Sequence, residues 1–272
     1  MPRINFAKQN LWVWIGATVI VSLTVVAVAA PLLATHDPDA IQLSEALLPP
    51  STTHWLGTDS LGRDLYSRLL FGARISLLVG VGAVGVAILI GVALGLVAGW
   101  YGGFVDSLMM RAVDVMLCFP TFFLLLAIVA MVGQSVGNII LIIGLTGWMG
   151  VTRLVRAEVL SLKEREFIQA ARVLGMRPAR IMWRHLLPNA LSPIVVSTTL
   201  GIGSAILVES GLSFLGLGVQ PPTPSWGNLL IDAKGTLGVA WWQTTFPGAA
   251  ILITVLAFNL LGEGLRERFG RS

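Results

Sequence analysis

The chain has 272 residues, of which 55% are hydrophobic and only 12% are charged. Soluble domains carry about 25% charged residues, so this composition excludes a disordered chain and an ordinary water-soluble enzyme. The mean hydropathy of +0.83 agrees with that exclusion. The single cysteine, Cys118, excludes an internal disulfide framework. The formal net charge of +4 is compatible with a nucleic-acid binder or with a membrane protein whose basic residues lie on one side.

Six apolar runs indicate transmembrane helices, each of which needs about 20 mostly apolar residues. In chain order the runs are Leu11–Leu33, Ile75–Tyr101, Met116–Val132 with a start nearer Ala112, Val136–Met149 with a continuation to Leu154, Leu191–Val208 and Pro247–Leu261. The first run is too long for the apolar region of a signal peptide, and five more follow it. The sequence therefore predicts an all-α membrane protein with six transmembrane helices.

The basic residues fall mainly on one side of the predicted membrane. With six crossings the two termini share a side, and that side holds 14 of the 18 lysines and arginines. Eight of these lie between Arg153 and Arg184, whereas the acidic residues divide evenly between the sides. Basic residues concentrate in cytoplasmic loops. We therefore expect both termini in the cytoplasm and no nucleic-acid partner.

The sequence contains no catalytic constellation. Residues 80–85 match the pattern Gly-x-Gly-x-x-Gly, but they lie inside an apolar run, where small residues allow helices to pack closely. No lysine follows a glycine, so the chain has no P-loop for ATP. His36, His54 and His185 are far apart in the sequence, and there is no His-Glu-x-x-His pair for zinc. We therefore predict no catalytic residue, no metal site and no cofactor bound by this chain.

Two acidic residues, Asp114 and Glu209, lie near predicted membrane boundaries. An acid inside a membrane is energetically costly, which makes it a functional candidate. The alternative is that each lies at the interface or caps a helix end. We favour that alternative for Asp114, while Glu209 stays open as a candidate for a substrate pathway.

The long basic loop, 153–190, is predicted to form a pair of helices. The capping-box spacing of Ser161 and Glu164 predicts a helix that continues to Leu174. Gly175 would end it, Pro178 would begin a second helix, and Pro188 would end that one. One face of the first helix carries, at helical spacing, Phe167, Ala170, Ala171 and Leu174. This face either docks on a partner or packs against the membrane helices of the chain itself.

The same loop carries a family resemblance. Gln169-Ala170-Ala171, Gly175, Ile181 and Leu187-Pro188 resemble the conserved cytoplasmic loop of bacterial ABC importer permeases, with Gln169 where glutamate is usual. The stretches from His54 to Asp59, from Leu61 to Arg74 and from Glu209 to Gly227 are similar to the C-type permease of dipeptide, oligopeptide and nickel importers. The resemblance extends over nearly the whole chain beyond residue 31.

The resemblance implies an ABC importer type I permease fold in the bacterial inner membrane. It divides the chain into residues 1–74 (cytoplasmic tail, first transmembrane helix and extracytoplasmic interfacial segment), a permease core at 75–265, and a cytoplasmic tail at 266–272. The coupling loop for the ATPase lies within that core, at 153–190. The residues assigned to coupling are Phe167, Gln169, Ala170, Ala171, Leu174, Gly175, Ile181, Leu187 and Pro188.

The implied function is that of a non-enzymatic permease subunit that moves di- or oligopeptides, or a nickel complex, into the cytoplasm. The implied partners are a second permease, two ABC ATPases that bind ATP and Mg, and an extracytoplasmic solute-binding protein. The alternative is a self-contained secondary transporter or channel. Such proteins commonly show internal repeats and ionisable groups near the middle of the membrane, and neither is visible in this sequence.

Overall fold

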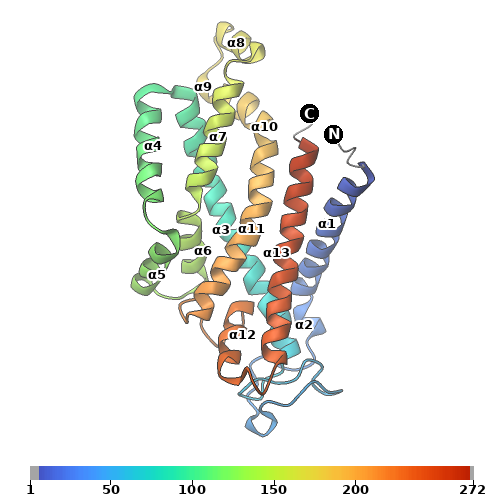
Figure 1. The fold of residues 1–272 in the computed structure, drawn as a ribbon. Helices are drawn as coiled ribbons and strands as arrows, with labels where there is room; N and C mark the ends of the chain where they lie inside the picture. The colour runs from blue at the N-terminus through green and yellow to red at the C-terminus, as the bar shows by residue number, and fades with distance from the viewer. Residues whose placement is uncertain (1–5, 270–272) are drawn as a thin grey trace.

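Figure 1 shows the computed structural model of the chain, which describes residues 6–269, with side chains from residue 11 onward. Its main helices are α1 Phe6–Val28, α2 Ala30–Leu33, α3 Leu65–Tyr101, α4 Gly103–Leu117, α5 Thr121–Val132, α6 Val136–Leu145, α7 Trp148–Leu162, α8 Glu166–Val173, α9 Pro178–Ile181, α10 Leu187–Asn189, α11 Leu191–Phe214, α12 Trp226–Asp232 and α13 Trp242–Phe269. A π-helical turn, Met182–Leu186, joins α9 to α10, and two 3-10 turns are Leu43–Glu45 and Ala233–Thr236. Within the described residues there is no strand, which confirms the predicted all-α class.

Four helices, α1, α3, α11 and α13, are each long and apolar enough to cross a membrane. Two further pairs pass the same test together but are bent, α4 with α5 by 83° and α6 with α7 by 41°. The number of spans is therefore six if each bent pair crosses once. This agrees with the six apolar runs in the sequence, although the third and fourth are broken helices.

The third apolar run was predicted to form one continuous helix, but the structure divides it between α4 and α5. The helix breaks between α4 and α5 at Pro120, because proline has no amide hydrogen to donate and disfavours a helical residue before it. Arg111, which precedes the predicted start of the third run near Ala112, lies inside α4. The acidic residues of α4 face α7, where Asp106 pairs with Arg156 and Asp114 pairs with Arg153. Two of the eight basic residues assigned to the loop therefore belong to α7.

Helix α3 is the centre of the bundle and packs along α6, α7 and α11, while α13 packs along α11 and α1. Its contact with α7 matches a row of glycines to a row of valines at the same spacing: Gly91, Gly95 and Gly99 against Val151, Val155 and Val159. A Cβ atom added to Gly95 would lie 2.7 Å from the Cβ of Val155. The predicted packing role of small residues in the membrane is thus confirmed at this interface.

Both described ends of the chain lie at the end of the bundle that carries α8 (Figure 1). The opposite end is covered by residues 34–64 and 215–241, which we call the distal platform. Its two segments are joined where the Arg63 guanidinium pairs with Asp59 at 2.6 Å and with Asp232 at 3.0 Å. Burial raises the pKa of Asp232, and the nearby charges of Arg63 and Arg68 oppose that shift. Ion pairs therefore hold the two segments of the distal platform together.

The helix ends do not coincide with the proposed divisions of the chain. The division at 74/75 falls inside α3, which begins at Leu65, and Leu65 is buried against the platform. The division at 265/266 falls inside α13, which continues to Phe269. The outermost predicted tail residues, including Arg3 and Arg271, lie outside the described residues.

Candidate functional site

The first candidate site is the helical protrusion formed by residues 163–190, which extends beyond the membrane helices at the end of the bundle where the two described ends lie (Figure 1). The predicted start of its first helix at Ser161 is wrong. Ser161 lies in the last turn of α7, and α8 begins after Arg165 without a side-chain cap. A capping residue must leave the helical conformation, and the uninterrupted helix of α7 keeps Ser161 in it.

The C-terminal end of α8 follows the prediction. Gly175 has a φ of 71°, and the amides of Gly175 and Met176 donate to the carbonyls of Arg172 and Ala171 at 2.9 and 3.1 Å. This pair of bonds is the Schellman arrangement, in which a residue without a Cβ tolerates the left-handed conformation. The direction in which the chain leaves α8 therefore depends on Gly175.

The second helix begins at Pro178 as predicted but continues past its predicted end. Pro188 lies in the first turn of α10, directly after the π-helical turn. Amides in the first turn of a helix have no carbonyl partner within that helix, so a proline there costs no hydrogen bond. Ile181 is fully buried, Leu187 is half-buried and Pro188 is exposed. Of the three residues that were assigned to coupling here, Ile181 and Leu187 therefore pack in the hydrophobic cluster shared with α7, whereas Pro188 does not.

Only part of the predicted docking face on α8 is free. Ala171 is buried together with Ile168 against α7 and the second helix. The exposed apolar side chains, which we call the free face of α8, are Phe167, Ala170, Val173 and Leu174. Val173 and Leu174 are 88% and 82% exposed. The expectation that Ala171 belongs to the docking surface is therefore corrected, because its Cβ points into the chain's own core.

Gln169 has a role in the structure that glutamate could not perform. Its Nε2 donates to the carbonyl oxygen of Lys163 at 2.9 Å, across the break between α7 and α8. That carbonyl lies at the C-terminal end of α7, where helices leave acceptors without partners. The amide of Gln169 therefore fastens α8 to the end of α7.

We expect Gln169→Glu to loosen α8 in the isolated chain. The carboxylate has no hydrogen to donate and would repel the Lys163 carbonyl, so the local stability should fall by about 1 kcal/mol. Hydrogen exchange of the α8 amides should become faster, while exchange in α3 stays unchanged. Glu164→Gln, an exposed neighbour, serves as the control. Equal exchange in both variants would contradict the assignment.

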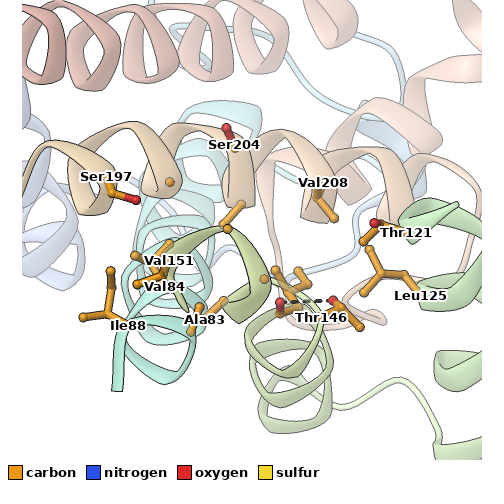
Figure 2. A pocket seen from close by; sticks show the side chains of 16 residues that line it. Ala83, Val84, Ile88, Thr121, Leu125, Thr146, Val151, Ser197, Ser204 and Val208 are labelled. Carbon is orange, nitrogen blue, oxygen red and sulfur yellow. Dashed lines mark hydrogen bonds between the residues drawn. The ribbon is translucent and has the colours of Figure 1, made fainter. Parts of the chain in front are cut away.

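The second candidate site is a cavity of about 260 Å³ in the middle of the bundle (Figure 2). Helix α11 forms one side of it, and α3, α5 and the junction of α6 and α7 form the others. The described lining residues are apolar or carry hydroxyls, without an ionisable group; the hydroxyls belong to Thr121, Thr146, Ser197 and Ser204. A site of this kind binds through shape and a few hydrogen bonds rather than through charge.

A larger hollow of about 810 Å³ continues from this cavity towards the α8 end of the bundle. The two share Ser197, Gly201 and Ser204, which lie on one face of α11. The larger hollow also reaches Glu158 and Arg266. These two hollows were not predicted from the sequence, although hydroxyl and glycine residues at helical spacing on an apolar helix were a usable signal.

Glu209 does not line either hollow. Its side chain is fully buried, and Oε1 accepts hydrogen bonds from Ser213 at 2.7 Å and from Ser225 at 2.9 Å. Ser225 caps the N-terminus of α12, so Glu209 ties α11 to the distal platform. Its neighbour Val208 lines the cavity instead. The structure thus places Glu209 in a packing contact between α11 and α12.

Comparison with known proteins places this architecture in a family. A family described as "Binding-protein-dependent transport system inner membrane component" matches residues 91–272, and "N-terminal TM domain of oligopeptide transport permease C" matches residues 7–50. The chain is 45% identical to the dipeptide transport system permease protein DppC of Alkalihalophilus pseudofirmus, over 96% of this chain and 86% of that protein. It is 42% identical to the glutathione transport system permease protein GsiD of Pectobacterium atrosepticum, over 97% and 87%.

A solved structure has the same fold. An inward-facing form of the MetNI methionine ABC transporter matches 73% of this chain and 94% of its own chain, with a TM-score of 0.60 and 17% identity. The fold likeness and the two family matches agree with the predicted ABC importer permease fold. The chain therefore belongs to the binding-protein-dependent transport system inner membrane components, as a transmembrane permease subunit of an ABC importer.

Proposed function

We propose that this chain is the C-type permease of an importer that moves di- or oligopeptides into the cytoplasm across a bacterial inner membrane. Relatives named for dipeptide, oligopeptide and glutathione transport support a peptide cargo, and a nickel complex is the alternative cargo. ATP and Mg would be bound by two partner ATPases, since this sequence has no P-loop. A second permease and an extracytoplasmic solute-binding protein would complete the assembly.

The observation that carries the proposal is the free face of α8. An exposed apolar surface on a polar protrusion is typical of a protein contact. The opposite face of α8 packs on α7, and α7 packs along α3 through the row of glycines. A force applied to α8 by an ATPase would therefore be transmitted to the helices that line the cavity.

The proposed orientation places α8 and both termini in the cytoplasm. Its support is the excess of basic residues on that side of the topology predicted from the sequence. Both described ends also lie at the same end of the bundle as α8 (Figure 1). The distal platform would then face the solute-binding protein. The hollow along α11 would be this subunit's half of the substrate path, with the second permease supplying the other half.

Uptake by the reconstituted importer tests this function. Proteoliposomes containing the permease pair and the ATPases, with binding protein outside, should accumulate labelled dipeptide only when ATP is enclosed at the ATPase side. The permease chain by itself should transport nothing. ATP-independent uptake by the chain alone would overturn the proposal in favour of a secondary transporter.

We expect Ser204→Trp to block this uptake, because Ser204 lines both hollows and the indole would occupy the space that they share. The initial rate should fall at least tenfold while assembly with the ATPases is retained. Val195→Trp is the control, since Val195 lies on the opposite side of α11 and is 39% exposed. Equal uptake by the two variants would place the path elsewhere.

A further inference from the structure

Two histidines and an aspartate that are far apart in the sequence meet in the distal platform. His36 follows α2, His54 lies in the loop that leads to α3, and Asp64 is the N-cap of α3. The Nδ1 atoms of His54 and His36 lie 2.9 and 3.8 Å from Oδ1 of Asp64. One ligand atom from each residue fits within a span of 4.8 Å. We propose that these three residues form a binding site for a divalent transition-metal ion of the zinc class.

The spacing of the three atoms suits such an ion. Zinc binds imidazole nitrogen and carboxylate oxygen at about 2.0–2.2 Å, which separates neighbouring ligand atoms of a tetrahedral site by about 3.3 Å. The two separations from Oδ1 of Asp64, 2.9 and 3.8 Å, bracket that value, and no two of the three ligand atoms are more than 4.8 Å apart. Rotation of the exposed His36 side chain towards the other two would complete a site with three protein ligands and one open position. Two imidazoles and a carboxylate favour zinc, nickel or copper over magnesium or calcium.

The surrounding hydrogen bonds bring the candidate ligand atoms together. Oδ2 of Asp64 is engaged as the helix cap, accepting from the amide and the hydroxyl of Ser67 at 2.8 and 2.7 Å. Oδ1 is hydrogen-bonded instead to Nδ1 of His54 at 2.9 Å, and an ion would take the place of the proton between these two atoms. Nε2 of His54 lies 3.2 Å from a carboxylate oxygen of Glu45. A carboxylate that accepts from one imidazole nitrogen orients the other towards a metal, and this is the usual second partner of a metal-bound histidine.

Two of the three candidate ligands, Asp64 and His54, are buried, and the third, His36, is open to solvent. The side chains of Asp64 and His54 are 1% and 6% exposed, whereas that of His36 is 39% exposed. The backbone of His36 is still held, because its amide donates to the Ser67 hydroxyl at 3.1 Å. An ion could thus approach beside His36, whose Nδ1 would exchange the Thr35 hydroxyl, at 3.0 Å, for the metal.

The rival interpretation is a purely structural hydrogen-bond network, in which His54 bridges Asp64 and Glu45. That arrangement uses both nitrogens of His54 and requires nothing of His36. His36 therefore discriminates between the two. The metal proposal concerns the platform alone and does not rest on the cargo or the orientation given above.

Metal binding to the assembled importer tests the proposal, with a purification tag that contains no histidine. After the importer has been treated with a chelator, one Zn²⁺ ion should bind tightly for each copy of this chain. Zn²⁺ should also raise the unfolding temperature of this chain. Co²⁺ should produce the visible absorption of a four-coordinate nitrogen and oxygen site. A wild-type protein whose unfolding temperature and calorimetric signal do not respond to Zn²⁺ would overturn the proposal.

Single substitutions assign the ligands. His36→Ala should weaken Zn²⁺ binding at least tenfold, and Glu45→Gln should weaken it by about 10- to 100-fold. His54→Asn keeps a hydrogen-bond donor near Asp64, so this variant should unfold at the temperature of chelated wild type and fail to respond to Zn²⁺. His185→Ala, at the other end of the bundle, should bind Zn²⁺ like wild type. Unchanged affinity in His36→Ala would exclude the site, as would loss of binding in His185→Ala alone.

Discussion

A Gly95→Leu variant is expected to lose the packing of α3 against α7 and to yield little folded protein. A Cβ atom at this position would already lie 2.7 Å from the Cβ of Val155 and 2.8 Å from the carbonyl oxygen of Thr152. A leucine adds three more carbons to a contact in which the neighbouring helix cannot move without losing its own partners. Forced overpacking costs about 1–3 kcal/mol and sometimes more, and the two helices would have to separate along their length.

The measurement is the yield of monodisperse protein in detergent and its unfolding temperature. Gly85→Leu is the matched control on the same helix, because a Cβ there would meet nothing within 4 Å. We expect that control to change the free energy of unfolding of the isolated chain by no more than about 0.5 kcal/mol. Similar yield and stability of the two variants would show that the close approach of α3 and α7 is not required.

An Ala170→Arg variant is expected to stop ATP-driven transport without unfolding the chain. Ala170 is exposed in the middle of the free face of α8, so arginine meets no neighbour within the permease. Within a contact with an ATPase, however, the long charged side chain would hold two apolar surfaces apart. Disruption of a central interface residue weakens binding by about 2 kcal/mol or more, which is roughly 30-fold. Co-purification of the ATPases, stimulation of ATP hydrolysis and dipeptide uptake should all fall together.

Ala171→Arg separates this docking effect from a folding effect. Ala171 is 5% exposed and packs beside Ile168 in the chain's own core. Arginine there should lower the unfolding temperature of the isolated permease, which Ala170→Arg should leave unchanged. Ala170→Ser preserves the small size and should retain the ATPases. If Ala170→Arg co-purifies with the ATPases and transports like Ala170→Ser, the free face of α8 is not the docking surface.

Local features of the fold were predictable from the sequence. Apolar run length locates spans because the hydrocarbon core requires a minimum length of apolar helix whatever its neighbours are. The end of α8 at Gly175 and the start of α9 at Pro178 were predictable for a similar reason, since each depends on the backbone of one residue. The helix start predicted at Ser161 was wrong, because the spacing of Ser161 and Glu164 is also compatible with Ser161 lying inside α7.

The candidate sites depended on contacts between distant segments. The family and the approximate position of the helical protrusion follow from the sequence. The side of α8 that is free does not, because both sides carry apolar residues and only packing on α7 decides between Ala170 and Ala171.

The sequence by itself determined that the chain is an apolar, all-α membrane protein with a basic loop between its fourth and fifth apolar runs, because chain composition and run length are local properties. The tertiary structure alone decided that α4 pairs its acids with α7, that a hydroxyl-lined hollow follows α11, and that His36 and His54 meet at Asp64. Each of these depends on residues that are brought together only when the chain folds, and no spacing along the chain records that distance.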